Sequence, residues 1–362
     1  MIAFRALIEA VIAIVFLNIG CQKHIDKDIA KQKQKVITLR QDANDSDLER
    51  LRDEKGVTTL QIQGMINGEA GPFITDAGLA YIKGWTDLRV LNLSWLHITD
   101  DGLANVSGLT KLEKLILIET KITDAGLAHL AGLTNMQELW LDFDSKITDA
   151  GLVHLRHMNH LKVLRLYSAP ITDIGVSYLA KMTEMEDLQL GNSQITDKGM
   201  EIIGGMKKLE TLDLQGTRIG DDGLAHIEKL EGLNWLALDR TQVGDAGLKC
   251  LENLQHLNYL YLENTKITDD GLEHLKGLSQ LNTLYLSRTK VADRGMEFLA
   301  RLTSLENLKI NETVVTDEGL LKLKGLKKLK YIEVHQTGVT PVGVESLKKL
   351  LPGVDVAMRK NY

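Results

Sequence analysis

The stretch from Lys121 to Leu141, KITDAGLAHLAGLTNMQELWL, contains the pattern on which this chain of 362 residues is built. Its core is Ile-Thr-Asp-x-Gly-Leu, followed by apolar residues at helical spacing and then by Leu-x-x-Leu-x-Leu. The Asp of this motif recurs at positions 76, 100, 124, 149, 173, 197, 221, 245, 269, 293 and 317, so nine of the ten intervals are 24 residues and one is 25. A fixed period of this length indicates an array of stacked repeats.

Each repeat predicts a strand, a turn and a helix. The leucines of Leu112-x-x-Leu115-x-Leu117 alternate with other residues, as in a strand with one buried face. Thr123 is expected to cap a helix whose first turn carries Asp124, where a carboxylate suits the positive end of the helix. The lack of a side chain at Gly126 would let this helix approach the neighbouring backbone. The predicted inward stripe of the helix is Leu127, Leu130 and Leu133.

The consensus Leu-x-x-Leu-x-Leu-x-x-Thr-x-Ile-Thr-Asp-x-Gly-Leu-x-x-Leu resembles the leucine-rich repeat family over about residues 57 to 356. It is most similar to the helix-containing bacterial class and to the ribonuclease-inhibitor-like and F-box-associated repeats. The resemblance implies an α/β solenoid, a curved array with parallel strands on the concave face and helices on the convex face. The Asn or Cys that this family has after the strand is mostly Thr here, at positions 120, 217, 241, 265, 289, 313 and 337.

The two ends of the chain differ from the array. Residues 1 to 21 predict a cleaved export signal, since their apolar run is shorter than a bilayer requires. Cys21 resembles the lipidated cysteine of bacterial lipoproteins, although Asn18 and Ile19 depart from that pattern; a plain signal peptide or an uncleaved anchor is the alternative. Residues 22–35 predict a polar tether, 36–87 N-terminal capping units in which Ser46 or Asp47 caps a helix, 88–338 the regular repeats and 339–362 a C-terminal capping unit.

Composition and motifs argue against several functions. A net charge of −6 gives no electrostatic reason to expect nucleic acid as a partner. The sequence has no Ser/His/Asp arrangement, phosphate-binding loop or paired CxxC, so we expect neither enzyme activity nor a cofactor. The histidines at 129, 154, 226 and 274 share one repeat position without a third ligand, so we expect no metal site. We expect a monomer.

The residues that flank the strand leucines are free to vary, and aromatic residues gather there. Reading the four flanking positions of eleven repeats gives 44 residues, which include nine of the chain's 17 aromatic side chains. Since parallel strands lie about 4.8 Å apart, Trp235, Tyr259, Tyr261 and Tyr285 should form one patch across three strands. The charged residues beside this patch are Arg240, Arg288, Asp239 and Glu263. Aromatic anchors with a charged rim are typical of protein interfaces, although aromatic residues also favour strands without any binding role.

A second aromatic group consists of Trp140, Phe143 and Tyr167. It lies beside the single 25-residue interval, where the extra residue falls within Asp142-Phe143-Asp144-Ser145 and could form a bulge.

The sequence therefore predicts an exported, membrane-tethered protein of the cell envelope that binds a protein or peptide on its concave sheet, with membrane attachment through Cys21 if this residue is acylated. Secretion without an anchor is an alternative localisation. An intracellular, cytoplasmic adaptor resembling F-box substrate receptors is an alternative function, and glycan or cell-wall binding by the same aromatic face is another.

Overall fold

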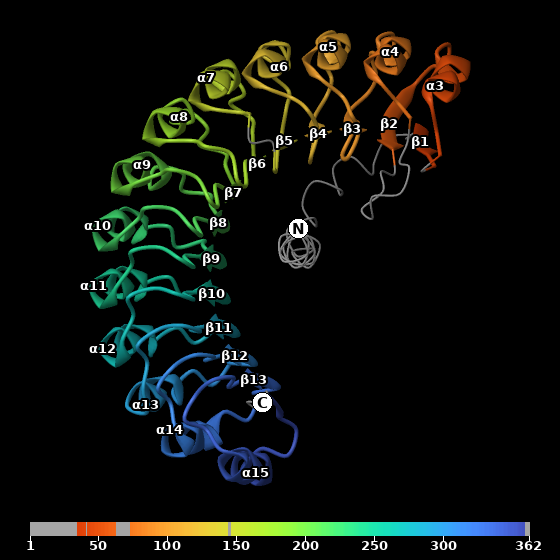
Figure 1. Ribbon diagram of the computed structural model, residues 1–362. Helices are drawn as coiled ribbons and strands as arrows, with labels where there is room; N and C mark the ends of the chain where they lie inside the picture. The colour runs from red at the N-terminus through yellow and green to blue at the C-terminus, as the bar shows by residue number, and fades with distance from the viewer. Residues whose placement is uncertain (1–34, 41, 63–72, 144–145, 359–362) are drawn as a thin grey trace.

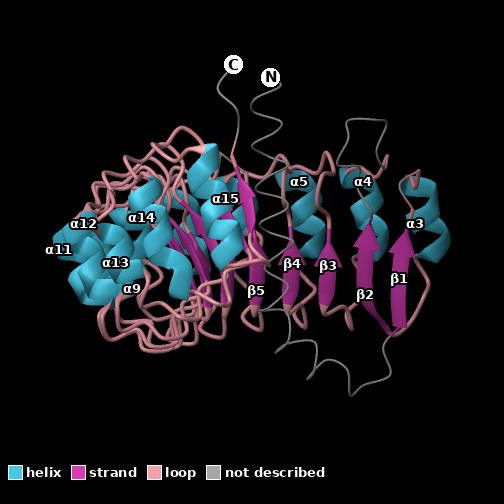
Figure 2. Cartoon of the chain, turned by 90° about the horizontal axis from the view of Figure 1, so that it is seen from below, coloured by secondary structure: helices cyan, strands magenta, loops and turns pink. Residues whose placement is uncertain are grey.

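The sheet of this protein is open and parallel, and its 14 strands follow one another in chain order. The computed structural model describes residues 35–40, 42–62, 73–143 and 146–358. The strands line the inner curve of an arc and the helices lie on its outer side (Figure 1). Seen from below, neighbouring strands point the same way (Figure 2). The solenoid predicted from the sequence, with concave parallel strands and convex helices, is confirmed.

A helix separates each strand from the next. The strands are β1 (Lys35–Leu39), β2 (Val57–Ile62), β3 (Val90–Asn92), β4 (Lys114–Ile116), β5 (Glu138–Trp140), β6 (Val163–Arg165), β7 (Asp187–Gln189), β8 (Thr211–Asp213), β9 (Trp235–Ala237), β10 (Tyr259–Tyr261), β11 (Thr283–Tyr285), β12 (Asn307–Lys309), β13 (Tyr331–Glu333) and β14 (Asp355–Ala357). The α-helices are α3 (Asp45–Leu51), α4 (Asp76–Leu79), α5 (Asp100–Leu103), α6 (Asp124–Ala128), α7 (Asp149–Leu152), α8 (Asp173–Ser177), α9 (Asp197–Ile203), α10 (Asp221–Leu224), α11 (Asp245–Leu248), α12 (Asp269–Leu272), α13 (Gly295–Leu299), α14 (Asp317–Lys322) and α15 (Pro341–Leu350). Short 3-10 turns continue some of them: η2 (Ala80–Ile82), η3 (Ala104–Val106), η4 (Val153–Leu155), η5 (Ala225–Ile227), η6 (Lys249–Leu251), η7 (Glu273–Leu275) and η8 (Leu323–Gly325).

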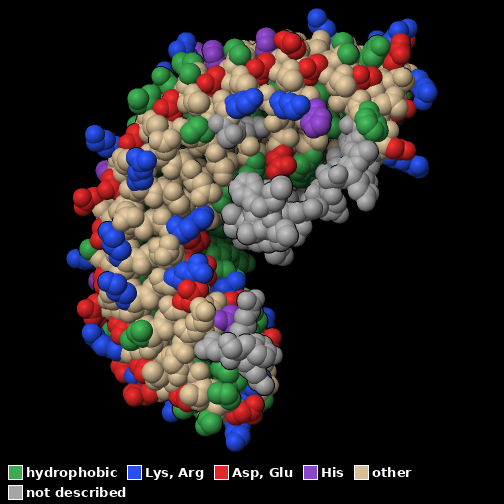
Figure 3. Space-filling model, in the orientation of Figure 1, with side chains coloured by type: hydrophobic (Ala, Val, Ile, Leu, Met, Phe, Trp, Pro, Cys, Tyr) green, Lys and Arg blue, Asp and Glu red, His purple; other side chains and the backbone are tan. Residues whose placement is uncertain are grey.

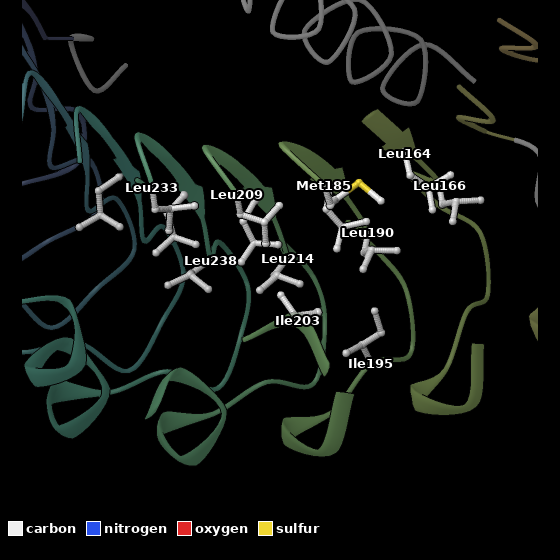
Figure 4. Close-up of a cluster of buried hydrophobic side chains, with 14 of the residues drawn as sticks. Leu164, Leu166, Met185, Leu190, Ile195, Ile203, Leu209, Leu214, Leu233 and Leu238 are labelled. Carbon is white, nitrogen blue, oxygen red and sulfur yellow. The ribbon is translucent and has the colours of Figure 1, made fainter. Parts of the chain in front are cut away.

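The core is a continuous layer of leucines between sheet and helices. Each repeat adds equivalent side chains, such as Leu190, Leu214 and Leu238, which are fully buried (Figure 4). Register is kept from strand to strand, and Leu212 of β8 pairs with Leu236 of β9. Burying one leucine contributes roughly 1.5–3 kcal/mol, so every repeat is stabilised by covering its neighbour.

The helices are shorter than the apolar stripe suggested. Helix α6 ends at Ala128, so Leu130 and Leu133 lie beyond it in turns, although both are fully buried. Helix α9 (Asp197–Ile203) extends two residues further, although the strand that follows it begins equally far from the helix start, so helix length varies between repeats. At the N-terminal end, the cap of α3 is Asn44 and not Ser46 or Asp47; Asn44 accepts from the Ser46 backbone N–H at 2.9 Å.

The repeated Asp joins consecutive repeats. Asp124 Oδ1 accepts from the backbone N–H of Thr148 at 2.7 Å, and its Oδ2 accepts from the Thr148 hydroxyl, also at 2.7 Å. Thr148 in turn accepts from the Ala150 N–H at 3.3 Å and so caps α7. As expected, Asp124 lies in the first turn of its own helix, and its carboxylate oxygens also bond to the cap of the next one. The recurring Thr and Asp are therefore parts of one ladder that runs along the convex side.

The motif glycine makes room for this ladder. A Cβ added to Gly151 would lie 2.4 Å from Asp124 Oδ1 and 3.2 Å from Asp124 Cα. No real Cβ approaches so closely, so a side chain here would push the carboxylate off Thr148. The expected close approach is present, and a carboxylate of the previous repeat fills the space.

Three junctions between repeats have one hydrogen bond of this ladder instead of two. Gly220, Gly244 and Ala292 stand where other repeats have Thr, and each donates only its backbone N–H to the preceding Asp, at 2.7, 2.6 and 2.7 Å. A second hydrogen bond to a charged carboxylate is missing at each of these junctions.

The Thr after each strand has a local role. Thr217 donates its hydroxyl to the carbonyl of Leu214 at 2.6 Å, and Thr241 donates to Leu238 at 2.6 Å. These hydroxyls bond the turn backbone within their own repeat.

The segments predicted as signal peptide (residues 1–21) and most of the tether (22–35) lie outside the described residues. Within the described ranges, no helix has the length and apolarity to cross a membrane. The proposed limits of the capping units and of the regular array stay predictions.

We expect Gly151→Ala to destabilise the array by roughly 1–3 kcal/mol, because the new methyl group displaces the Asp124 carboxylate. Urea unfolding followed by far-UV circular dichroism measures the effect. Gly132→Ala is the matched control, since a Cβ at Gly132 meets nothing within 4 Å. Equal unfolding midpoints for the two variants would contradict the close approach.

We expect Gly220→Thr to stabilise the protein by about 1 kcal/mol, because the backbone of Gly220 already has the extended geometry of the capping Thr residues, with φ −121° and ψ −161°. A Cβ would lie 3.7 Å from Asp197 Oδ2, within reach of a hydroxyl on the next atom. Thermal unfolding of Gly220→Thr is compared with that of Gly220→Val, which has the same shape without the hydroxyl. If both variants unfold at the same temperature, the hydroxyl link contributes nothing.

Candidate functional site

The candidate site is the inner face of the sheet, where side chains that flank the strand leucines meet. In β9, Leu236 is fully buried, so the alternation of a strand turns Trp235 and Ala237 towards the inner curve. The space-filling view shows apolar side chains and charges of both signs together on this curve (Figure 3).

The aromatic patch of Trp235, Tyr259, Tyr261 and Tyr285 lies on three adjacent strands. Tyr259 pairs in register with Trp235, and Tyr261 with Tyr285. The rings of Trp235 and Tyr261 have centroids 5.1 Å apart, and those of Tyr261 and Tyr285 are 4.8 Å apart in an edge-to-face arrangement. Trp235 is only 6% exposed, whereas Tyr259 is 38% exposed. Tyr259 is thus the member of the patch that offers most surface.

A lysine closes one end of the patch. Lys309 Nζ lies 4.3 Å from the centroid of the Tyr285 ring and 3.3 Å from Glu333 Oε1. Glu333 also accepts from Asn311 at 2.7 Å and from the hydroxyl of Tyr331 at 3.0 Å. At this end of the patch, the charge of Lys309 is therefore paired with Glu333, and Glu333 also has two hydrogen-bond donors.

The second aromatic group is largely occupied by the protein itself. The guanidinium of Arg165 lies 4.0 Å from the centroid of the Trp140 ring, and Lys114 Nζ lies 4.9 Å from it. Arg165 is buried and pairs with Asp187 at 2.8 Å. The ring of Trp140 thus already stacks with two cations of the same sheet.

Phe143 and Tyr167 complete this group, with ring centroids 5.3 Å apart. Tyr167 is 5% exposed, which makes it a packing residue at least as much as a contact for a partner. The predicted bulge at Asp142-Phe143-Asp144-Ser145 falls partly on residues 144–145, which lie outside the described residues.

The two arginines beside the aromatic patch make internal contacts. Arg240 is exposed, and its Nη2 donates to Asn192 at 3.1 Å and to Gln215 at 3.2 Å. Arg288 Nε donates to Glu312 Oε1 at 2.8 Å. Arg240 is therefore hydrogen-bonded to two side-chain amides, and Arg288 forms an ion pair.

Carboxyl groups on this face bond to the backbone, either of the next repeat (Asp142 and Asp239) or of their own (Asp213). Asp142, Asp213 and Asp239 each use Oδ1 to accept a backbone N–H, from Tyr167 at 3.0 Å, Gln215 at 2.9 Å and Glu263 at 2.6 Å. Burial raises the pKa of Asp142 to about 6, with Arg165 opposing the shift. Burial also raises the pKa of Asp213 to about 7 and that of Asp239 to about 8. These groups change charge near neutral pH.

One set of positions that the sequence suggested as free is constrained. The residue two places after the second strand leucine has a positive φ in each repeat, for example 57° at Arg240 and 60° at Arg288. Its backbone N–H forms a hydrogen bond to the next repeat: the N–H of Arg240 donates to the carbonyl of Glu263 at 2.8 Å. The left-handed turn limits β-branched residues here, so these positions vary less freely than those on the strands.

A hollow of about 600 Å³ lies away from the aromatic patch, at the edge of the array where β4, β5 and β6 begin. Its lining is charged and includes Arg89, Lys111, Glu113, His160, Lys162 and Glu184. Lys111 pairs with Asp87 at 2.7 Å and Lys162 with Glu186 at 3.3 Å, so part of its charge is internally compensated. Among the described residues, no group of three His, Cys, Asp or Glu side chains is placed to hold a metal ion.

Sequence reasoning did not single out Arg165, Asp187, Lys114 or Lys309. Each of them occupies a position that was read as variable, but nothing in one sequence shows which cation lies on which ring. The sequence feature that could have indicated these contacts is an aromatic residue and a cation at the same position of neighbouring repeats, as in Trp140 with Arg165 and Tyr285 with Lys309.

The geometry agrees with comparisons to known proteins. Residues 146–310 match a family model described as a leucine-rich repeat region, and residues 86–107 match a second leucine-rich repeat model. The chain is a leucine-rich repeat protein. Arrays of this family are typically non-catalytic scaffolds that bind on extended concave surfaces.

Solved structures share the fold of this leucine-rich repeat protein. An internalin of Listeria monocytogenes is similar with a TM-score of 0.72 and 24% identity, covering 93% of this chain and 89% of the internalin. A leucine-rich repeat protein of Leptospira interrogans has a TM-score of 0.50 and 17% identity, covering 83% of this chain and 90% of that protein. A comparison with curated proteins gave no significant match.

Proposed function

We propose that this protein binds a protein or peptide on its concave sheet, with the aromatic patch as the anchor. The observation that carries the proposal is the contact chain from Trp235 through Tyr261 to Tyr285, beside the more exposed ring of Tyr259. Large rings in a partly buried cluster supply much of the binding energy at protein interfaces, at low entropic cost. The charged residues Asp239, Arg240, Glu263 and Arg288 form the rim.

Cross-linking tests where a partner lies. A photo-reactive residue with an aromatic ring, which keeps a ring in the patch, is placed at position 259 of the full chain, and a matched one at Ile174, which is 62% exposed on the convex helix α8. After exposure to an extract of the native cell, adducts at 259 but not at 174 support the concave face. Adducts that contain sugar and no polypeptide support glycan binding in place of protein binding.

With a partner in hand, we expect Tyr259→Ala to weaken binding about tenfold or more, because it removes the most accessible ring of the patch. Surface plasmon resonance with the full chain measures the dissociation constant, and Ile174→Ala serves as the control. An affinity unchanged by Tyr259→Ala would show that the patch is not the anchor.

We further propose that the protein is exported and tethered to the membrane through an acylated Cys21. The support is sequence alone: an apolar run up to Ile19, then Gly20 and Cys21, then a Lys-rich polar stretch. Such a tether would hold the array near a membrane surface.

Labelled fatty acid tests the anchor. We expect the wild-type chain to incorporate palmitate and to fractionate with membranes, and Cys21→Ser to lose both properties because it removes the thiol. Cys250→Ser is the control, since it removes the other cysteine of the chain. Equal labelling of wild type and Cys21→Ser would exclude acylation at this residue.

A further inference from the structure

The concave sheet binds two of its own cations by the same arrangement. Arg165 lies on the ring of Trp140 and pairs with Asp187 on the next strand. Lys309 lies on the ring of Tyr285 and pairs with Glu333 on the next strand. Each time a positive side chain has an aromatic face on one side and a carboxylate on the other, which is a favourable environment for a desolvated cation.

Between these two sites the same components occur, but among the described residues no cation stacks on the rings of Trp235, Tyr259 or Tyr261. Trp235, Tyr259 and Tyr261 lie on β9 and β10. The carboxyl groups next to them are Asp213, Asp239 and Glu263. Asp213 pairs in register with Ala237, and Ala237 pairs with Tyr261. Within the part of the chain that the structure describes, none of the three carboxyl groups forms an ion pair, although each is on the inner face by strand alternation.

The three carboxyl groups influence one another's ionisation. Arg240 is the cation nearest to this group in sequence and lowers the pKa of Asp239, but its Nη2 donates to Asn192 and Gln215. Burial, and then the charges of Glu263 and Asp213, raise the pKa of Asp239 to about 8 despite a backbone hydrogen bond and Arg240. Arg240 acts on Asp239, and Lys309 acts on Glu263. A further positive side chain between the carboxyl groups would favour the ionised form of Asp239, whose charge its acidic neighbours oppose.

A polar group nearby also has no partner. Ser287, two residues after Tyr285 and so on the same face of the sheet, is 6% exposed, and its hydroxyl makes no hydrogen bond in the described structure. Leaving a buried hydroxyl unpaired costs about 1–3 kcal/mol. A polar group of a bound partner, placed next to Glu263, would supply the missing hydrogen bond to the Ser287 hydroxyl.

We propose that the occupant of the concave face is a peptide segment that presents Lys or Arg side chains. This rests on the concave-face function proposed above. At least one of these side chains lies against the rings of Tyr259 and Tyr261 and pairs with Asp239 and Glu263, while Asp213 adds to the attraction. The two internal cations, Arg165 and Lys309, show the geometry that the partner's side chain adopts. The peptide backbone crosses the strands, as the row of rings from β9 to β11 does.

The experiment selects peptides from a random library displayed on phage, using the full chain as bait. Phage that also bind Tyr259→Ala are removed, so the remaining peptides depend on the aromatic patch. We expect these peptides to be enriched in Lys and Arg. Each selected peptide is then synthesised with citrulline in place of Arg or norleucine in place of Lys, which removes the charge at similar size.

A triple variant tests the carboxyl groups. We expect Asp213→Asn/Asp239→Asn/Glu263→Gln to weaken binding of the selected peptides about tenfold or more, and the uncharged peptides to lose a similar factor against the wild-type chain. The matched control is Asp222→Asn/Glu228→Gln/Glu231→Gln, which replaces three carboxyl groups by amides at exposed positions outside the strands and should alter binding less than twofold. Far-UV circular dichroism checks that every variant is folded.

The outcomes separate the two proposals. Peptides that require Tyr259 but contain no essential Lys or Arg would overturn the cationic partner and leave concave-face binding intact. Equal losses in the concave and convex triple variants would mean that only net charge matters, which also overturns this proposal. If no wild-type-binding phage remain after those that bind Tyr259→Ala are removed, both proposals are wrong.

Discussion

The fold depends on a carboxylate shared between repeats. A stack of short strands and single-turn helices gains little from any one repeat, because helices of four or five residues are unstable alone. Asp124 joins two of them by accepting both the backbone N–H and the hydroxyl of Thr148, and the absence of a side chain at Gly151 gives the carboxylate its place. The same hydroxyl caps the next helix. One interaction therefore starts a helix, sets the distance to its neighbour and explains why Thr, Asp and Gly recur together.

Much of this architecture follows from the sequence, because period and alternation are local properties. The spacing of Asp residues and the leucines of each strand predict the parallel array, its concave sheet and its convex helices. The length of the helices was not predictable in the same way. Leu130 and Leu133 have helical spacing from Leu127, but both lie after the end of α6. They are buried all the same, because an irregular segment can also place leucines against the core at such intervals.

The partners of polar groups were less predictable still. Asp124 at a helix start suggested a local electrostatic role, and only the stacking of repeats shows that its oxygens reach Thr148. On the concave face the sequence placed Trp235, Tyr259, Tyr261 and Tyr285 in one region. It did not show that Trp235 is mostly buried or that Trp140 already carries Arg165, because both depend on side-chain directions that a single sequence does not encode.

The unequal junctions of the convex ladder have a mechanical consequence. Gly220, Gly244 and Ala292 each leave one bond fewer between neighbouring repeats, and they lie behind the strands from β7 to β11. An arc held together on its outer side bends most easily where that side is held least. These three junctions lie on the outer side of the same repeats whose inner side carries the aromatic patch, with one fully bonded junction, Asp245 to Thr268, between them.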